Sequence, residues 1–377
     1  MKQESIRVAQ VMGMMYNGGV EAVVMNYYRA IDRSRVQFDF FVDETSAFPQ
    51  RPEIEKLGGR CFLVPPYARP IRYLRALVRA FRQNGYSIVH AQINTMGVFP
   101  LFAAWLAGVP VRICHNHSTA HRGEGKKSLL KALLRPFSRL FATQCFACGD
   151  VAARWMYGDR FVNRGCATVL PNAIDLSQFL FSAEHRAAVR QEIGADRNTL
   201  VVGHIGRFLF PKNHPFLLQI FRALLTVRPN SLLMLAGEGD LYASCKALAQ
   251  ELGIESRVRF LGVRRDAYRL YSAMDVFCLP SFYEGLPVVM VEALANGLTC
   301  VVSDKVTREL HAYSVLQLSL DADALLWAKA LSLATRSAEA PEALAHAFDI
   351  HQNAKRLQAF YIDQSCQAAS QRFNPSA

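Results

Sequence analysis

Two glutamates stand eight positions apart in an otherwise apolar segment, SFYEGLPVVMVEALANG. Pro287 suits the first turn of a helix, so Gly285 and Leu286 would present their amides at the positive end of the helix dipole, where an anion can bind. Glu284 would lie just outside this helix, and Glu292 would lie inside it among aliphatic side chains. A buried carboxylate needs hydrogen-bond donors. Two sources are open: the hydroxyls of a ribose, or an arginine of a neighbouring helix in a core ion pair.

The segment GHIGRFLFPKNH carries two cations between an apolar, strand-like run and a helical pattern. Arg207 directly follows the run, and Lys212 comes just before the next helix. Cations beside a helix start, at the carboxyl end of a strand, suit a diphosphate. A solvated basic loop explains the same spacing equally well.

Two motifs in the first half also follow apolar runs. In YNGGVE, Gly18 and Gly19 precede a helical pattern, so backbone could approach a phosphate or sugar closely, although a plain turn explains the pair as well. In VRICHNHS, His115 ends a strand-like run. This position suits a cleft better than a core, and a metal or structural role is as open as a catalytic one.

Length and composition describe a globular protein of two domains. The chain has 377 residues, of which 51% are hydrophobic and 20% charged. The nine cysteines form no framework and suit a reducing compartment. Cys145 and Cys148 have zinc spacing but no second pair, so no metal site is expected. Neither a signal peptide nor a membrane span is apparent, which predicts a cytoplasmic protein.

Apolar runs alternate with amphipathic segments, which is typical of parallel α/β sheets covered on both faces. We predict strands at 6–12, 37–42, 60–64, 88–91, 111–115, 144–147, 200–205, 231–236, 258–261, 276–279 and 299–303. The segment TVLPNAIDLSQF reads as a linker, and a terminal helix at 349–361 precedes a polar tail. These features predict two doubly wound, Rossmann-like domains, 1–170 and 171–354, that face each other across a ligand-binding cleft.

Some nucleotide-binding motifs are absent. No G-x-G-x-x-G follows the first strand, and RGEGKKS lacks the upstream glycine of a Walker loop. Dinucleotide oxidoreductases and P-loop enzymes are therefore disfavoured.

Taken together, the motifs resemble those of retaining glycosyltransferases of family 4, which have the GT-B fold, and in particular an exopolysaccharide-type branch. The resemblance covers nearly the whole chain. It rests on NGGVE, ICHNHS, GRFLFPKNHPFLLQIF, LMLAGEGDL, VRFLGVRRD and, above all, PSFYEGLPVVMVEALANG. Glu284 and Glu292 match the E-x(7)-E signature of the family. The segment HAQ (90–92) departs from the His-x-His of many relatives, and GLTCVVS departs from the usual Gly-x-Pro.

The resemblance implies a role for each residue of the second half. Arg207 and Lys212 would neutralise the diphosphate of a nucleotide-sugar donor, and Glu292 would hold its ribose. Glu284 would lie against the donor sugar. The amides of Gly285 and Leu286 would lie near the sugar, and the backbone around Val263 would frame the base.

In the first half, the resemblance implies that Gly18 and Gly19 approach the diphosphate and that His115 faces the sugar and the reacting carbon. The terminal helix would rejoin the first domain, over 355–377. No metal or other cofactor is expected, because retaining members of this fold generally work without one. The donor would be a UDP-sugar, with GDP as the alternative, and the acceptor a glycan or a polyprenyl-diphosphate-linked glycan. A GT-B nucleotide-sugar epimerase and a non-catalytic nucleotide-sugar-binding protein are the alternatives.

The net charge of +12 lies entirely in the first half, where residues 1–172 carry 23 basic against 11 acidic side chains. Two amphipathic segments there each place basic residues on one helical face. They are Arg69, Arg72, Arg75, Arg79 and Arg82 in the first, and Lys127, Lys131, Arg135 and Arg139 in the second. Such faces suit an anionic membrane surface, at about 1 kcal/mol per basic residue, or are simply solvated. Nucleic acid is disfavoured, because no binding motif accompanies the charge.

Overall fold

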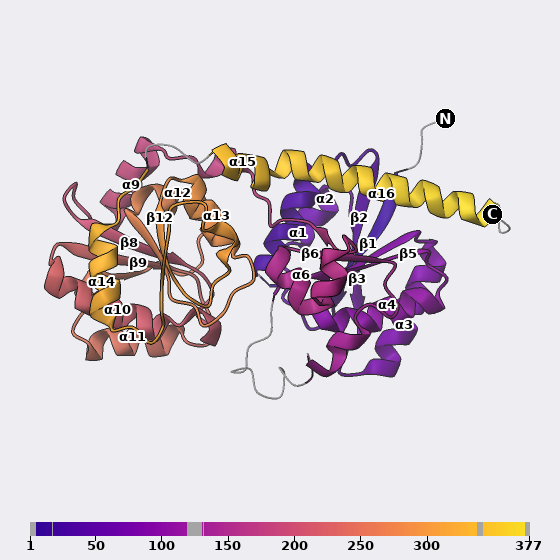
Figure 1. Ribbon diagram of the computed structural model, residues 1–377, viewed down its shortest axis with the longest axis horizontal. Helices are drawn as coiled ribbons and strands as arrows, with labels where there is room; N and C mark the ends of the chain where they lie inside the picture. The colour runs from indigo at the N-terminus through magenta and orange to yellow at the C-terminus, as the bar shows by residue number, and fades with distance from the viewer. Residues whose placement is uncertain (1–4, 17, 119–129, 131, 338–341, 374–377) are drawn as a thin grey trace. The chain divides into compact units, whose positions relative to one another are not determined.

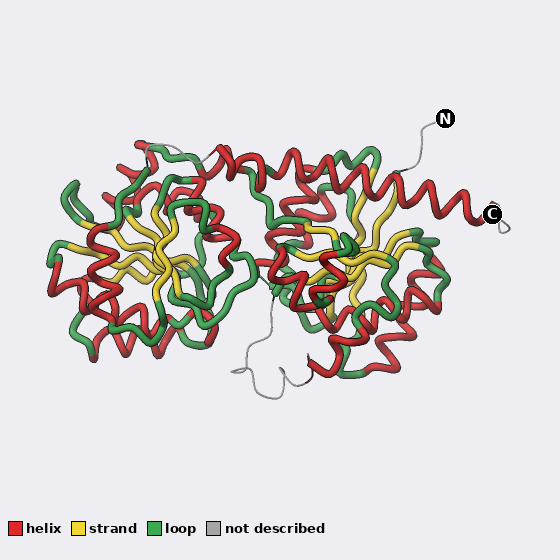
Figure 2. Tube along the Cα trace, in the orientation of Figure 1, coloured by secondary structure: helices red, strands yellow, loops and turns green. Residues whose placement is uncertain are grey.

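The computed structural model describes residues 5–16, 18–118, 130, 132–337 and 342–373. The chain forms two compact units, Met1–Ala173 with Ile350–Ala377, and Ile174–Asp349. We call them unit 1 and unit 2. Each contains one parallel sheet with helices on both faces, as Figures 1 and 2 show.

The sheet of unit 1 has the strand order β3-β2-β1-β4-β5-β6-β7. Its strands are β1 (Ile6–Gly13), β2 (Val36–Asp43), β3 (Arg60–Val64), β4 (Ile88–Ala91), β5 (Val111–Asn116), β6 (Gln144–Ala147) and β7 (Thr168–Val169). The order reverses between β1 and β4. Ligands of such sheets bind at this reversal, beyond the carboxyl ends of the strands.

The helices of unit 1 follow the predicted α/β alternation. They are α1 (Gly19–Ala30), α2 (Arg51–Lys56), α3 (Pro70–Asn84), α4 (Val98–Leu106), α6 (Asp150–Tyr157), α7 (Asp159–Asn163) and α16 (Ile350–Phe373), with 3-10 turns η1 (Asn94–Gly97) and η3 (Arg135–Phe137). No helix in the described part of the chain combines the length and apolarity needed to cross a bilayer.

The C-terminal helix α16 is longer than predicted. The segment read as a polar tail continues the helix to Phe373. Helix α16 packs along α1 in unit 1 (Figure 1). It buries Ala354, Leu357, Tyr361 and Ala368 together with the polar Asn353, and its other described polar residues are exposed or partly exposed. The tail prediction was wrong because a helix with one narrow apolar stripe reads as polar sequence.

The second basic segment of unit 1 differs from the amphipathic helix that was predicted. Lys127 and Lys131 lie outside the described residues. Arg135 and Arg139 stack on the rings of Trp155 and Phe161, at 5.8 and 4.7 Å from the ring centroids. The helical turn breaks into η3 at Arg135, beside a proline, so these two arginines are held by aromatic faces and do not continue a helical stripe.

Unit 2 repeats the plan with the order β10-β9-β8-β11-β12-β13, which reverses between β8 and β11. Its strands are β8 (Leu200–Ile205), β9 (Ser231–Ala236), β10 (Val258–Phe260), β11 (Val276–Leu279), β12 (Thr299–Ser303) and β13 (Val315–Leu318). Its helices are α8 (Leu176–Phe179), α9 (Ala183–Ile193), α10 (His214–Val227), α11 (Tyr242–Glu251), α12 (Ala267–Ala273), α13 (Val288–Ala295), α14 (Ala324–Leu333) and α15 (Glu342–Phe348), with turns η4 (Phe210–Lys212), η5 (Glu255–Arg257) and η6 (Arg308–Leu310).

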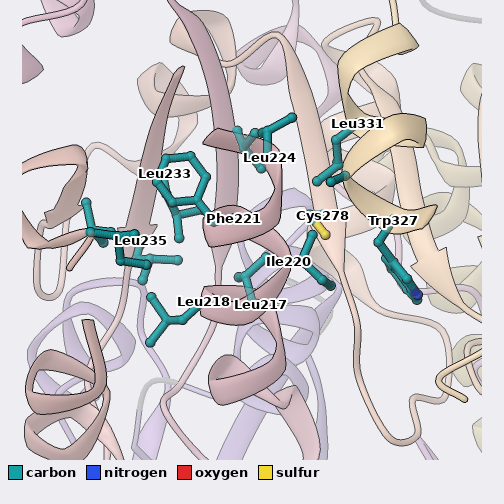
Figure 3. Packing of buried hydrophobic residues seen from close by; sticks show 14 of the residues in the cluster. Leu217, Leu218, Ile220, Phe221, Leu224, Leu233, Leu235, Cys278, Trp327 and Leu331 are labelled. Atoms are coloured by element: carbon teal, nitrogen blue, oxygen red, sulfur yellow. The ribbon is translucent and has the colours of Figure 1, made fainter. Parts of the chain in front are cut away.

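The core of unit 2 lies between this sheet and helices α10 and α14. Figure 3 shows Phe221 and its neighbours on α10 packed with Trp327 and Leu331 against the strands. Trp327 is fully buried, and its indole nitrogen donates to the carbonyl of Ser319 at 3.1 Å. This rigid layer holds α10, and Lys212 lies two residues before its start, at the end of η4.

The eleven predicted strands are all present, each within one residue at either end. Two short edge strands were missed. β7 begins the segment interpreted as a linker, and β13 comes from the weakly alternating LQLSL region. Both lie at sheet edges, where few hydrogen bonds are needed and the sequence pattern is correspondingly weak.

Candidate functional site

The strand order of unit 2 brings the ends of β8 and β11 together. The two strands are hydrogen-bonded neighbours at the point where the order reverses. Gly206 and Arg207 follow β8, and the loop from Pro280 to Pro287 follows β11. The predicted diphosphate loop and the first glutamate therefore lie at one edge of one sheet, where α/β proteins bind ligands.

Lys212 and Glu284 meet at this edge. The Lys212 Nζ donates to Glu284 Oε1 at 2.6 Å, and the Ser281 hydroxyl donates to the same oxygen at 3.0 Å. The side chains are 20% and 15% exposed, so both are accessible to a ligand. A diphosphate that binds Lys212 would compete with Glu284 for this ammonium group.

The positive charge at this edge comes from Arg207 and Lys212, and the nearby histidines add none. Arg207 is exposed and makes no ion pair with any residue that the structure describes. Burial, together with the charge of Lys212, lowers the pKa of His204 to about 4, although the Cys278 carbonyl opposes this shift. Burial also lowers the pKa of His214 to about 2, so both imidazoles are neutral at pH 7.

Glycines let neighbouring loops pack tightly behind Arg207. Gly237 has φ +135°, and a Cβ there would lie 2.1 Å from the carbonyl oxygen of Gly206. Its amide donates to Gly262 at 2.8 Å, which ties the loop after β9 to the loop after β10. Gly239 approaches the Phe208 carbonyl in the same way. The spacing of the AGEGD segment thus reflects close backbone contact.

Replacing Gly237 by alanine should lower the free energy of unfolding by roughly 2 kcal/mol, because the new Cβ meets rigid backbone at an unfavourable φ. Gly253→Ala is a matched control. Gly253 has φ +69°, but its Cβ would meet open space, so a cost of about 1 kcal/mol is expected. Urea denaturation of unit 2 measures both. Equal costs would show that crowding against Gly206 does not shape this loop.

Glu292 is the fifth residue of α13, in a helix whose other side chains are mostly buried, as predicted. Its hydrogen-bond partner is the hydroxyl of Tyr271 on α12. Among the described residues Glu292 forms no ion pair, so the alternative of a core pair with arginine is not observed. Burial raises the pKa of Glu292 to about 7, against the lowering effect of the Tyr271 hydrogen bond. One donor leaves capacity for others on the carboxylate.

The remaining predicted residues of unit 2 lie around this edge. Leu286 is buried and Gly285 partly so, in the loop that leads from Glu284 into α13. Helix α13 begins at Val288, with Pro287 as its N-cap. Val263 follows Gly262 after β10 and is 53% exposed. Sequence reasoning missed Ser281 and Tyr271, because a single serine or tyrosine gives no spacing signal.

The predicted glycines of unit 1 lie at the start of α1, after β1. A Cβ on Gly18 would lie 2.4 Å from Glu21 Oε2, whereas the space in front of Gly19 is open. Glu21 also accepts the amide of Tyr16 at 3.2 Å. A Cβ on Gly18 would therefore displace the Glu21 carboxylate, whereas Gly19 leaves room for a ligand to approach the backbone.

The open cleft position expected for His115 is not observed, and its role toward the sugar stays a prediction. His115 is 1% exposed, with its ring stacked between those of His90 and His117 and edge-on to Phe146. The motif was placed correctly on β5, but His115 points to the face of the sheet that α16 covers. Gln10, Gln92 and Tyr361, which sequence reasoning missed, share this buried cluster.

Among the described residues, no group of three or more His, Cys, Asp or Glu side chains is arranged to hold a metal ion. Cys145 lies opposite Cys114 on the neighbouring strand, and both are buried thiols.

Known families account for both units. A model described as "Glycosyltransferase Family 4" matches residues 17–178, and one described as "Glycosyl transferases group 1" matches residues 185–310. The putative glycosyltransferase EpsF of Bacillus subtilis (strain 168) is 40% identical over 347 residues, which are 89% of this chain and 89% of EpsF. The chain belongs to glycosyltransferase family 4, in its exopolysaccharide-type branch.

This family 4 glycosyltransferase is similar to two further proteins. The UDP-Gal:alpha-D-GlcNAc-diphosphoundecaprenol alpha-1,3-galactosyltransferase of Escherichia coli is 26% identical over 318 residues, 79% of each chain. The crystal structure of Anabaena HepE in complex with UDP-glucose superposes with a TM-score of 0.78 at 20% identity, covering 95% of this chain and 99% of HepE. The two doubly wound domains predicted from the alternating pattern, and the GT-B fold that the resemblance implies, are confirmed.

Proposed function

We propose that this glycosyltransferase moves a sugar from a UDP-sugar to a polyprenyl-diphosphate-linked glycan, with retention of the anomeric configuration. The observation that carries the proposal is the Lys212–Glu284 pair at the strand-order reversal of unit 2, together with Arg207, which pairs with no described acidic residue. The names of the E. coli galactosyltransferase and of HepE with UDP-glucose support the donor class, and the former supports the acceptor class.

In this proposal the donor's diphosphate takes over Lys212 and also binds Arg207. Two cations at the diphosphate stabilise the negative charge that develops as the nucleotide leaves, without requiring a metal. Glu284, released from Lys212 but still bonded to Ser281, lies against the sugar beside the amides of Gly285 and Leu286.

The other contacts in the proposal position the nucleotide. Glu292 accepts hydrogen bonds from the ribose hydroxyls in addition to the one from Tyr271. The backbone around Val263 frames the base, and Gly18 with Gly19 approaches the diphosphate. His115 faces the sugar in this proposal. Its side chain is 1% exposed in the structure, and its Nε2 forms no hydrogen bond with a described residue.

Retention follows, in this proposal, from attack by the acceptor hydroxyl on the face that the diphosphate leaves. The leaving phosphate takes the hydroxyl proton. Glu284 is the carboxylate nearest to the sugar in this scheme, but its Oε1 already accepts from Lys212 and Ser281, which makes it a poor nucleophile.

Product analysis with labelled UDP-sugars and a polyprenyl-diphosphate-linked acceptor tests this proposal. Transfer to the lipid with an unchanged anomeric configuration, undiminished by EDTA, is expected. Inverted product would contradict retention. Epimerised donor, or unreacted donor despite binding, would favour the epimerase or the non-catalytic binding protein.

Donor binding should depend on pH through Glu292. Its pKa is about 7 in the free protein, and ribose hydroxyls that donate to it favour the ionised form. Because the ionised fraction rises from about a tenth at pH 6 to about nine tenths at pH 8, the Kd for UDP-glucose should fall about tenfold over this range. Calorimetry measures it. In Glu292→Gln, the Kd should be independent of pH and higher at pH 8. A wild-type Kd that does not change with pH would show that Glu292 does not bind the ribose.

We also propose that one face of unit 1 rests on an anionic membrane. Helix α3 buries Tyr73, Leu77 and Phe81, so its arginines point away from the core. Among the described residues no acidic side chain pairs with Arg72, Arg75 or Arg79. The charge of this face is therefore not neutralised within unit 1.

Apolar side chains accompany these arginines. Helix α4 packs beside α3 and exposes Trp105, which contacts Phe141 at a ring distance of 5.7 Å. Residues Leu133 and Leu140 of the neighbouring segment are each 64% exposed. A groove of about 520 Å³ between α3 and α4 is lined by Leu74, Arg75, Val78, Arg79, Arg82, Gln83 and Leu106. Cations beside exposed aliphatic and indole groups match the interface of an anionic bilayer.

A further inference from the structure

A row of polar side chains crosses the buried face of the unit 1 sheet. Gln10 on β1 lies opposite His90 on β4, and His90 lies opposite Ile113 on β5. Because alternate residues of a strand share a face, Gln92, His115 and His117 continue the same row. Helix α16 covers this face and adds Tyr361.

These side chains form one continuous chain of hydrogen bonds. From its first end, His117 Nε2 lies 2.8 Å from Gln92 Oε1, and Gln92 Nε2 donates to Gln10 Oε1 at 2.8 Å. Gln10 Nε2 then donates to the Tyr361 hydroxyl at 3.2 Å. The Tyr361 hydroxyl also lies 2.7 Å from His90 Nδ1. His90 Nε2 lies 3.1 Å from His115 Nδ1, which is the last contact of the chain of hydrogen bonds.

The Tyr361 hydroxyl decides where the ring protons lie. It accepts from Gln10, so its single proton is donated to His90 Nδ1. Burial, followed by the nearness of the titratable His117 ring, lowers the pKa of His90 to about 3, so the His90 ring is neutral and carries its proton on Nε2. His90 therefore donates to His115 Nδ1. His115, whose pKa burial also lowers well below its usual value, keeps its proton on Nε2.

The hydrogen bonds also determine which nitrogen of His117, at the other end, carries the proton. The amide group of Gln92 donates to Gln10, so its oxygen must accept from His117 Nε2–H. Burial lowers the pKa of His117 to about 3, so its Nδ1 carries no proton. Along this chain of hydrogen bonds, each group thus donates to the next in the direction from His117 to His115.

The two ends are left without partners. Neither His115 Nε2 nor His117 Nδ1 forms a hydrogen bond with a described residue, although the side chains are only 1% and 7% exposed. Their rings stack with centroids 4.0 Å apart. One end is a donor and the other an acceptor. A hydroxyl group satisfies both, because it accepts through its oxygen and donates its proton.

We propose that Tyr361 is a positioning residue that fixes the histidine tautomers, so that His115 Nε2–H and His117 Nδ1 together bind one hydroxyl group. The hydroxyl belongs to a water molecule or to a sugar. Only the sugar alternative rests on the proposed function. The C-terminal helix thereby controls the polarity of a site beyond β5 that it does not line.

The first test needs no substrate. In the full chain, with its ten histidines ¹⁵N-labelled, two-bond ¹⁵N–¹H spectra report which nitrogen of each ring carries the proton. We expect His90, His115 and His117 all to be neutral Nε2–H tautomers from pH 5.5 to 8. An Nδ1–H tautomer or an imidazolium at His115 would overturn the proposal.

Tyr361→Phe removes the hydroxyl alone. We expect His90 and His115 to become mixtures of tautomers in this variant, with their two ¹⁵N shifts drawn together. Tyr27→Phe is the matched control, because Tyr27 is also buried in unit 1 but donates to the backbone carbonyl of Pro171 at 2.8 Å. Single tautomers in Tyr361→Phe, or mixtures in both variants, would show that Tyr361 does not set them.

The second test distinguishes water from sugar. If the hydroxyl belongs to the sugar, saturating UDP-glucose shifts the ¹⁵N signals of His115 and His117 but UDP does not, and Tyr361→Phe lowers kcat about tenfold with an unchanged Kd for UDP. If the hydroxyl belongs to water, the signals ignore both ligands while the tautomers stay fixed. Failure of the enzyme to use UDP-glucose would leave the tautomer result standing, so the two proposals fail separately.

Discussion

Lys212→Ala should lower kcat for sugar transfer by about 10²–10³-fold at saturating donor. In the unbound protein the Lys212 ammonium group is held 2.6 Å from Glu284, at the reversal point of the unit 2 sheet. The proposed diphosphate binds there, and its negative charge grows as the sugar bond breaks. Removing a preorganised cation from that position weakens an interaction that is strongest in the transition state, so turnover falls more than donor affinity. Steady-state kinetics with a UDP-sugar measures both.

Two controls separate this role from a structural one. Lys246→Ala removes a lysine of the same unit that lies over the rings of Tyr242 and Phe260, and it should leave kcat unchanged. The Lys212–Glu284 pair is partly exposed, so its loss should cost about 1 kcal/mol or less of unfolding free energy. Lys212→Arg should recover most of kcat, since it keeps the charge. A Lys212→Ala enzyme with more than a third of wild-type kcat would place the diphosphate elsewhere.

The strands could be predicted because buried parallel strands are continuous apolar runs, and the site residues of unit 2 could be predicted because they follow such runs. Once β8 and β11 are recognised as strands, doubly wound topology brings their carboxyl ends together, and with them Lys212 and Glu284. Neither inference needs side-chain detail. Short edge strands such as β13 could not be predicted from apolar runs, because a strand at the edge of a sheet can be short and need not be continuously apolar.

The surroundings of His115 could not be predicted in this way. Tyr361 is 271 residues from His90 in the sequence, and nothing local marks either as a partner of the other. The sequence shows a histidine at the end of a strand, and only the packing of α16 decides that this histidine is buried. The role of Gln92 could not be predicted either. It looks like a lost histidine in the HAQ segment, yet it links His117 to Gln10.

Replacing Arg72, Arg75 and Arg79 together by glutamine should weaken binding of the protein to anionic vesicles by roughly 100-fold. Each basic residue near an anionic surface contributes about 1 kcal/mol, so three contribute about 3 kcal/mol. Vesicles of phosphatidylglycerol and phosphatidylcholine, sedimented at low salt, measure the partition coefficient. Binding to phosphatidylcholine alone should be negligible for both proteins.

A second triple variant tests whether the face or merely the net charge matters. Arg35, Arg160 and Arg164 are exposed residues of unit 1 outside α3, and their replacement by glutamine changes the net charge equally. We expect this variant to bind the same vesicles within about threefold of wild type. An equal loss of vesicle binding in the two variants would show that the protein binds through its net positive charge and not through the α3 face.

The apolar side chains give an independent measurement of orientation. Trp105 is 53% exposed on α4, beside the arginines of α3. If this face enters the headgroup region, tryptophan emission shifts to shorter wavelength on vesicle binding, and Trp105→Phe abolishes the shift without abolishing binding. Strong binding with no Trp105 shift would mean that another face meets the lipid. Because α4 packs on β4 and β5 and α3 packs on α4, a membrane docked on this face would hold unit 1 in one orientation toward a lipid-linked acceptor.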